Sequence, residues 1–155
     1  MIEQRLKELD IVLPEVTSPL YEYVPVTTHA GVAYISGQVP RINGKIPYPG
    51  KVGQEVTVEQ AQELAEYCVL KALSCLQAEI GSLNNVEKVL KVTGYVQAAD
   101  DFYEPSSVVD GASRLLEKIF GEKGRHTRTV IGVAVLPSNT PVEIDFIIAI
   151  KERAK

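Results

Sequence analysis

Two apolar segments near the C-terminus constrain the fold more than any other feature of the sequence. Residues 127–136 and 142–150 are rich in β-branched side chains and are separated by Pro137-Ser-Asn-Thr-Pro141, which predicts two strands joined by a turn. Apolar side chains occupy both sides of each strand, as the neighbours Phe146 and Ile147 illustrate in the second. A strand with one solvated face alternates apolar and polar residues, so these segments indicate a sheet that is buried on both faces.

A long amphipathic helix is predicted over about residues 57–80. Its apolar positions recur at steps of three and four residues, as one helical face requires. Thr57 and Gln60 form a capping-box pattern, and Gly81 supplies the C-terminal stop. A second amphipathic helix is predicted over about residues 111–120. Two helices cover only one face of a sheet, so a second copy of the chain is the simplest cover for the other face, and we expect an oligomer.

Neither the cysteines nor the charged residues of the long helix indicate a catalytic role. Cys68 and Cys75 lie seven residues apart on the apolar stripe, about 10 Å along a helix, which is too far for a disulfide. We therefore expect two free, buried thiols and a cytoplasmic location, where thiols stay reduced. The charged side chains of the same helix are predicted to form a solvated face: Glu59, Glu63, Glu66 and Lys71.

The remaining segments complete an α+β fold. Residues 1–10 predict a short helix, and residues 32–36 predict a strand that pairs with a short following strand through the turn Asn43-Gly44. Residues 86–96 predict a further strand. After the first helix the order is β-β-α-β-α-β-β, which predicts a mixed sheet packed on one face by two helices. A chain of 155 residues, 45% of them hydrophobic, can hold such a core as one domain.

Several classes of function are disfavoured. A formal net charge of −4 provides no bulk attraction for nucleic acid or for an anionic membrane. The first residues are polar, and the apolar segments are far shorter than a membrane helix. The sequence contains no glycine-rich phosphate loop and no C-x-x-C, and its two histidines could form at most half of a zinc site. We therefore expect no cofactor and no metal.

Three segments carry polar residues where a strand would otherwise be apolar: Tyr34-Ile-Ser-Gly-Gln38, Gly124-Arg-His-Thr-Arg128 and Pro141-Val-Glu-Ile-Asp145. With Leu136-Pro137 between the last two, they resemble the signature of the RidA family, also called YjgF and historically endoribonuclease L-PSP. The resemblance extends over residues 23–150. It implies a single domain over 1–155, in which residues 1–22 form an N-terminal extension with a short helix.

The resemblance implies a chorismate-mutase-like fold and a homotrimer whose sheets face the centre, with clefts between subunits. It also implies a cofactor-independent hydrolase. Such an enzyme deaminates reactive enamine or imine acids, for example 2-aminoacrylate, to 2-keto acids and ammonia. The expected partners are therefore a small carboxylate substrate and two further copies of the chain.

Roles for individual residues follow from the same resemblance. Arg128 would bind the substrate carboxylate through its guanidinium fork, and Glu143 would position or deprotonate the attacking water. The remaining pocket positions fall on Tyr23, Ser36, Gly37, Asp100 and Val130, with Tyr21 as the alternative to Tyr23. Asp100 stands where the family commonly has asparagine, and its charge would repel a carboxylate ligand.

Two other functions and a simpler role for the arginine stay open. Asp100 favours a trimer that binds small carboxylates without turnover, or that regulates a partner. An endoribonuclease or translation inhibitor is disfavoured by the acidic composition. Without the resemblance, Arg128 fits a strand-end arginine tied to a surface acid, and Glu143 fits a solvated strand carboxylate. The predicted strands place these two residues about seven residues, or ~23 Å, apart along the strand axis, so a shared pocket would need two chains.

Overall fold

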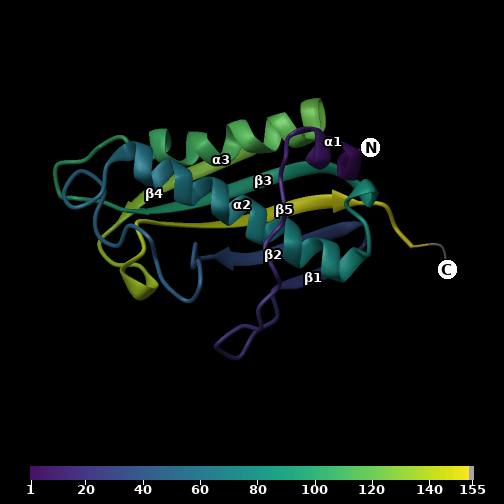
Figure 1. The fold of residues 1–155 in the computed structure, drawn as a ribbon, viewed down its shortest axis with the longest axis horizontal. Coiled ribbons are helices and arrows are strands. Elements are labelled where there is room, and N and C mark those ends of the chain that lie inside the picture. The colour runs from purple at the N-terminus through teal and green to yellow at the C-terminus, as the bar shows by residue number, and fades with distance from the viewer. Residues whose placement is uncertain (154–155) are drawn as a thin grey trace.

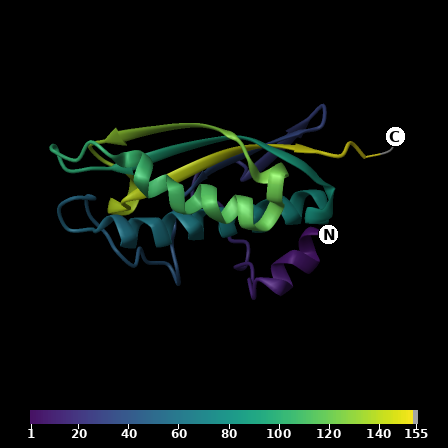
Figure 2. The same ribbon diagram turned by 90° about the horizontal axis from the view of Figure 1, so that it is seen from above.

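The computed structural model describes residues 1–153 and contains one mixed, five-stranded sheet of order β1-β2-β5-β3-β4 (Figure 1). The strands are β1 (Val26–His29), β2 (Val32–Gln38), β3 (Val86–Gln97), β4 (Thr127–Val133) and β5 (Val142–Ile150). The helices are α1 (Ile2–Glu8), α2 (Val58–Ile80) and α3 (Pro105–Phe120), with short 3₁₀ turns η1 (Leu83–Asn85), η2 (Gly121–Gly124) and η3 (Pro137–Asn139). The α+β class, the mixed sheet and the packing of both long helices on one face are confirmed (Figure 2).

Helix α2 forms as its periodicity predicts. The Thr57 hydroxyl accepts from the backbone N–H of Gln60 at 3.1 Å, and the Gln60 side chain accepts from the backbone N–H of Thr57 at 3.0 Å. This reciprocal cap satisfies two N–H groups that the first turn leaves unpaired. The helix ends at Ile80 and is capped by Gly81, whose φ of 86° suits a residue without a β-carbon.

Helix α3 begins earlier than predicted. It starts at Pro105 rather than near residue 111, because proline favours the first helical position and Val108 and Val109 already pack into the core. Gly111 therefore lies inside the helix. A β-carbon there would lie 2.8 Å from the backbone oxygen of Gln62 on α2, so the glycine allows the two helices to approach closely.

The first hairpin differs from the prediction. Its turn is Ala30-Gly31, which joins β1 to β2, and not Asn43-Gly44. Both pairs have positive φ, and Asn43-Gly44 does close a tight turn through a bridge between Ile42 and Lys45. No strand of the described chain continues from that bridge. Prolines flank the turn on both sides and remove the N–H donors that a ladder needs.

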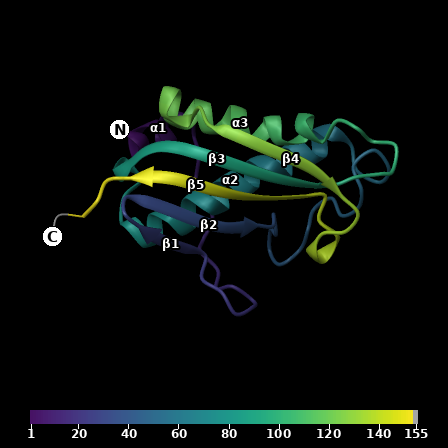
Figure 3. The same cartoon turned by 180° about the vertical axis from the view of Figure 1, so that it is seen from behind.

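The sheet has one covered face and one open face. Residues of β5 alternate along the strand: Val142, Ile144, Phe146, Ile148 and Ile150 are buried, whereas the residues between them are half-buried. The predicted burial on both faces is therefore absent within one chain. Figure 3 shows the face without helices. Tyr34 and Ile131, which alternate with core residues of β2 and β4, are 48% and 46% exposed.

The N-terminal extension crosses α2 and ends in a loop that projects beyond β1 (Figures 1 and 3). The predicted short helix is confirmed as α1, and Asn84 accepts from its first N–H at 2.8 Å. Further along, the Ser74 hydroxyl of α2 donates to the carbonyl of Pro14, and the Ser36 hydroxyl of β2 donates to that of Val24, both at 2.7 Å. Among residues 1–153, helices that could cross a lipid bilayer are absent.

Candidate functional site

A cavity of about 1080 Å³ lies where β2 ends and β5 begins. The register between these strands shifts between Ile35 and Gln38, so the chain after β2 diverges from β5 and leaves space. The N-terminal extension forms one wall of the cavity, and α2 contributes another. The side chains and backbone that matter below all line it: Tyr21, Tyr23, Ser36, Gly37, Arg41, Tyr67, Lys71 and Glu143.

Glu143 occupies the position next to Gly37. A β-carbon on Gly37 would lie 2.9 Å from Glu143 Oε2 and 3.1 Å from its Cδ, so the absence of a side chain makes room for the carboxylate. Burial raises the pKa of Glu143, and the neighbouring Asp145 carboxylate raises it further, while the Arg41 guanidinium opposes both effects. Its raised pKa makes this carboxylate a stronger base than an exposed glutamate.

Asp145 lies two residues further along β5. The Tyr95 hydroxyl of β3 donates to Asp145 Oδ2 at 3.2 Å. Burial raises the pKa of Asp145, and hydrogen bonds from Tyr95 and Thr93 partly offset this rise. Two neighbouring carboxylates with raised pKa values disfavour double ionisation, so Asp145 tunes the proton affinity of Glu143.

Arg128 lies in a different place. Its Nη1 donates to Asp110 Oδ1 at 2.8 Å and to the Ser113 hydroxyl at 3.1 Å, both on α3. The side chain is 23% exposed and lines a separate hollow of about 230 Å³ with His126. Within one chain, Arg128 is thus a strand-end arginine paired with a surface acid.

His126 supports this arrangement. Its Nδ1 is 2.6 Å from the carbonyl of Gly124, which can only accept, and its Nε2 is 2.9 Å from the Ser113 hydroxyl.

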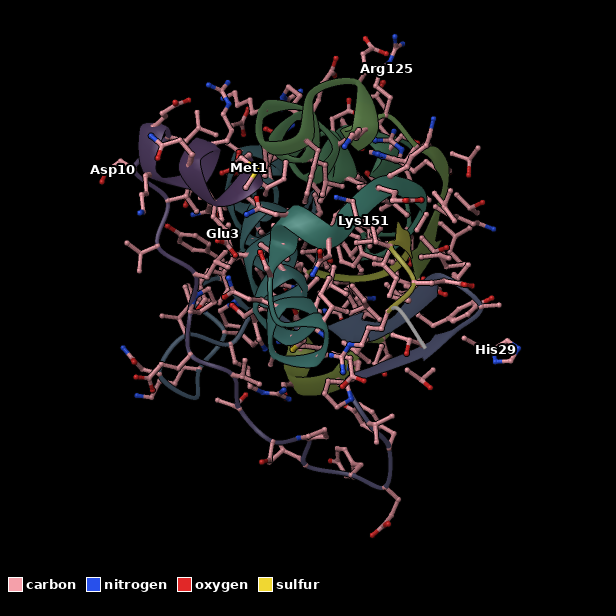
Figure 4. The ribbon with its side chains drawn as sticks, turned by 90° about the vertical axis from the view of Figure 1, so that its right-hand side faces the viewer. Met1, Glu3, Asp10, His29, Arg125 and Lys151 are labelled. Atoms are coloured by element: carbon pink, nitrogen blue, oxygen red, sulfur yellow. The ribbon has the colours of Figure 1, made fainter. Side chains whose placement is uncertain are left out.

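His29 lies at the end of β1 and points away from the protein, far from Arg125 in Figure 4. Residues 1–153 contain no group of three histidine, cysteine, aspartate or glutamate side chains that could hold a metal ion.

Arg128 and Glu143 are closer than predicted, but they belong to opposite faces of the sheet. Arg128 pairs with Val92 of β3, and Glu143 pairs with Tyr95, three residues further along β3. Their offset along the strand axis is therefore about 10 Å and not ~23 Å. Arg128 contacts α3 on the covered side. Glu143 lies between the buried Val142 and Ile144, so it alternates to the other side.

The other predicted positions divide into two groups. Tyr23, its alternative Tyr21, Ser36 and Gly37 line the cavity with Glu143. Val130 is half-buried against the core, and Asp100 lies in the exposed turn after β3, outside the cavity. The structure therefore does not bring Asp100 next to Glu143 in one chain.

Two cations of the cavity were not predicted. Lys71 was expected on a solvated face, yet it is half-buried and its Nζ donates to the carbonyl of Val39 at 2.7 Å. Arg41, which follows Pro40, donates to the Ser138 hydroxyl. The only sequence signal for Lys71 was its place beside the apolar stripe, three residues after Cys68.

Cys68 and Cys75 are free and buried, as expected. Cys68 Sγ donates to the carbonyl of Gln38 at 3.3 Å. Burial raises the pKa of the Cys68 thiol far above its usual value. Since the thiolate is the nucleophile, this cysteine is chemically inert at neutral pH.

Comparison with known proteins places the chain in a well-populated structural group. Residues 3–149 match the model of a family described as "YjgF/chorismate mutase-like, putative endoribonuclease". The chain is 35% identical to Protein TCP17 of Trypanosoma cruzi over 148 residues, which cover 95% of this chain and 92% of that protein. It is 42% identical to the crystal structure of protein Atu1372 from Agrobacterium tumefaciens, whose function is unknown, with a TM-score of 0.88 and coverage of 97% and 92%. A "putative endoribonuclease" from Shewanella oneidensis is 30% identical, with a TM-score of 0.92 and coverage of 97% and 99%.

Proposed function

The chain belongs to the YjgF/chorismate mutase-like family, and from this membership and the cavity around Glu143 we propose that it is a RidA-like hydrolase of small enamine and imine acids. The observation that carries the proposal is the placement of Glu143. A carboxylate with a raised pKa lines a large cavity, beside a glycine that leaves room for it.

The proposed chemistry needs only water and proton transfer. Glu143 takes a proton from a water molecule as the water oxygen attacks the carbon of the C=N bond of a 2-imino acid. The protonated carboxyl group then returns the proton to nitrogen. Glu143 then takes the hydroxyl proton of this carbinolamine and passes it to nitrogen as the carbonyl forms and the C–N bond breaks, so ammonia leaves. One imino acid and one water therefore give one 2-keto acid and one ammonia. An enamine enters the same sequence after it tautomerises to the imine.

The substrate carboxylate needs a cation, and we assign this role to Arg128 of a neighbouring copy. Within one chain the guanidinium belongs to the covered face and Glu143 to the other. A guanidinium has five N–H donors. Asp110 and Ser113 bind Nη1, and the carbonyl of Ser106 accepts from Nη2 at 3.4 Å, so two donors remain for a ligand. A trimer whose sheets face the centre would also cover the exposed Tyr34 and Ile131.

A second candidate is a trimer that binds carboxylates without turnover. The ion pair between Arg128 and Asp110 favours it, because a substrate carboxylate must compete with a carboxylate already 2.8 Å away. An endoribonuclease has less support, since the chain has a net charge of −4 and the cavity contains a prominent carboxylate.

One coupled assay separates these candidates. An amino-acid oxidase generates 2-iminobutanoate, and the release of 2-oxobutyrate is followed with and without the protein. We expect acceleration by the wild type and a loss of at least about a hundredfold in Glu143→Gln. Binding of 2-oxobutyrate with no acceleration would instead support the non-catalytic trimer.

A further inference from the structure

Two cationic side chains, Arg41 and Lys71, line the cavity. Arg41 follows β2, and Lys71 projects from α2. Both side chains belong to half-buried residues, and each has one hydrogen bond to a neutral group: Arg41 to the Ser138 hydroxyl and Lys71 to the carbonyl of Val39. Among residues 1–153, neither cation has a carboxylate within 4 Å. The cavity thus contains two positive charges that lack a direct counter-ion.

These cations have donors to spare. An ammonium group has three N–H donors and a guanidinium has five, so after the bonds to Val39 and Ser138 most of them are free to bind an anion. A cation that is removed from water without a partner is unfavourable. Burial lowers the pKa of Lys71, which is the expected response of an uncompensated ammonium group.

Glu143 forms no ion pair with either cation among residues 1–153. The Arg41 guanidinium is close enough to lower the pKa of Glu143, but burial and Asp145 raise it. Both cations therefore keep donors that a ligand carboxylate can bind directly.

The size of the cavity agrees with a longer ligand. A volume of about 1080 Å³ is slightly above the range of about 300–1,000 Å³ for small-molecule sites and far exceeds a three-carbon imino acid. Tyr21, Tyr23 and Tyr67 line the same space, so it combines apolar walls with a few placed charges.

We propose that Arg41 and Lys71 bind a second carboxylate, so that the substrates of this protein are dicarboxylic 2-imino or 2-enamino acids. The identity of the reacting carbon rests on the proposed function, whereas the anion subsite rests on the cavity alone. One carboxylate binds the neighbouring Arg128, the C=N carbon lies at Glu143, and the side-chain carboxylate reaches Arg41 and Lys71.

Titration calorimetry on the full chain tests the subsite with two stable probes. 2-Oxoglutarate has the second carboxylate and 2-oxobutyrate lacks it. We expect the wild type to bind 2-oxoglutarate at least about tenfold more tightly, since charge-assisted hydrogen bonds supply that difference. Arg41→Gln and Lys71→Met should each bring the ratio close to one, because each removes one cation. The matched control Lys45→Met, an exposed lysine in the same loop as Arg41, should keep the wild-type ratio.

A charge-preserving variant distinguishes the loss of a positive charge from a loss of folding. Lys71→Arg should retain the preference, whereas a loss of the preference in Lys71→Arg and Lys71→Met alike would contradict an electrostatic role. A wild type that binds the two probes equally, or binds neither, would overturn the subsite.

Hydrolysis separates the subsite from the proposed function. If 2-iminobutanoate and 2-iminoglutarate are hydrolysed equally well, and the calorimetric ratio is one, the subsite is wrong and the proposed function stands. If 2-oxoglutarate binds through Arg41 and Lys71 but neither imine is hydrolysed faster, the subsite stands and the proposed function is wrong.

Discussion

Glu143 Oε2 lies 2.9 Å from the point that a β-carbon on Gly37 would occupy. This spacing couples the end of β2 to the start of β5, because any side chain at position 37 has to displace the carboxylate. Glycine at this position has a spatial role, since its φ lies outside the left-handed region.

Gly37→Ala should therefore disable the site with little effect on the backbone. The methyl group shifts the Glu143 carboxylate, and a displacement of about 1 Å can cost about a hundredfold in rate. The measurement is kcat/KM for 2-iminobutanoate hydrolysis. Gly132→Ala is the matched control, because the nearest atom to a β-carbon there is 3.7 Å away. An unchanged rate in Gly37→Ala would contradict the proposed role of Glu143.

The pH dependence should report the neighbour of Glu143. The carboxylate acts as a base only when deprotonated, so kcat/KM should rise as pH increases through its raised pKa. Asp145→Asn removes the adjacent negative charge and should move this rise to lower pH. A pH–rate profile of each variant measures the shift, with the exposed Glu87→Gln as control. A profile that Asp145→Asn leaves in place would show that Asp145 does not influence the reacting group.

Mixed oligomers should reveal whether two chains share one site. Arg128→Ala and Glu143→Gln should each be nearly inactive, because each removes one essential group. When the two variants are co-expressed and assemble at random, about a quarter of the clefts in a cyclic oligomer combine an intact Arg128 with an intact Glu143. We expect that share of wild-type activity from the mixture. No recovery in a verified mixed trimer, or a monomer in sedimentation experiments, would contradict the shared site.

The close contact between α2 and α3 at Gly111 predicts that a larger residue there lowers the stability of the fold. In Gly111→Ala the new β-carbon meets the backbone oxygen of Gln62 at 2.8 Å, so the helices must separate. We expect the free energy of unfolding to fall by about 1–3 kcal/mol, as overpacking does in other cores. Chemical denaturation measures this, and Gly132→Ala again serves as the control. If Gly111→Ala is as stable as the wild type, the two helices can separate at that point without a cost in the free energy of folding.

Local patterns in the chain were enough to predict α2, α1 and the extent of β5. A capping box, a terminal glycine and a periodic apolar stripe involve residues within a few positions of one another, so a linear sequence displays them directly. The resemblance carried by Arg128, Leu136-Pro137 and Glu143 predicted the family for the same reason, because motif spacing is also a property of the linear chain.

The first hairpin and the position of Lys71 depended on contacts that no short segment contains. Asn43-Gly44 has the turn chemistry of a hairpin, but its flanking prolines and the pairing of β2 with β1 decided otherwise. Lys71 resembles any exposed lysine of an amphipathic helix until the carbonyl of Val39, distant in sequence, is placed 2.7 Å from its ammonium group.

Residue types, spacings and helical periodicity therefore determined α1, α2 and the family, and they marked Arg128 and Glu143 as candidate site residues. Their placement on opposite faces of the sheet, and the meeting of Arg41, Lys71 and Glu143 around one cavity, came from strand register and packing. A shift of one residue in register exchanges the two faces of a strand. The energy that selects one register is spread over the whole core, so only the assembled fold shows which charges share a space.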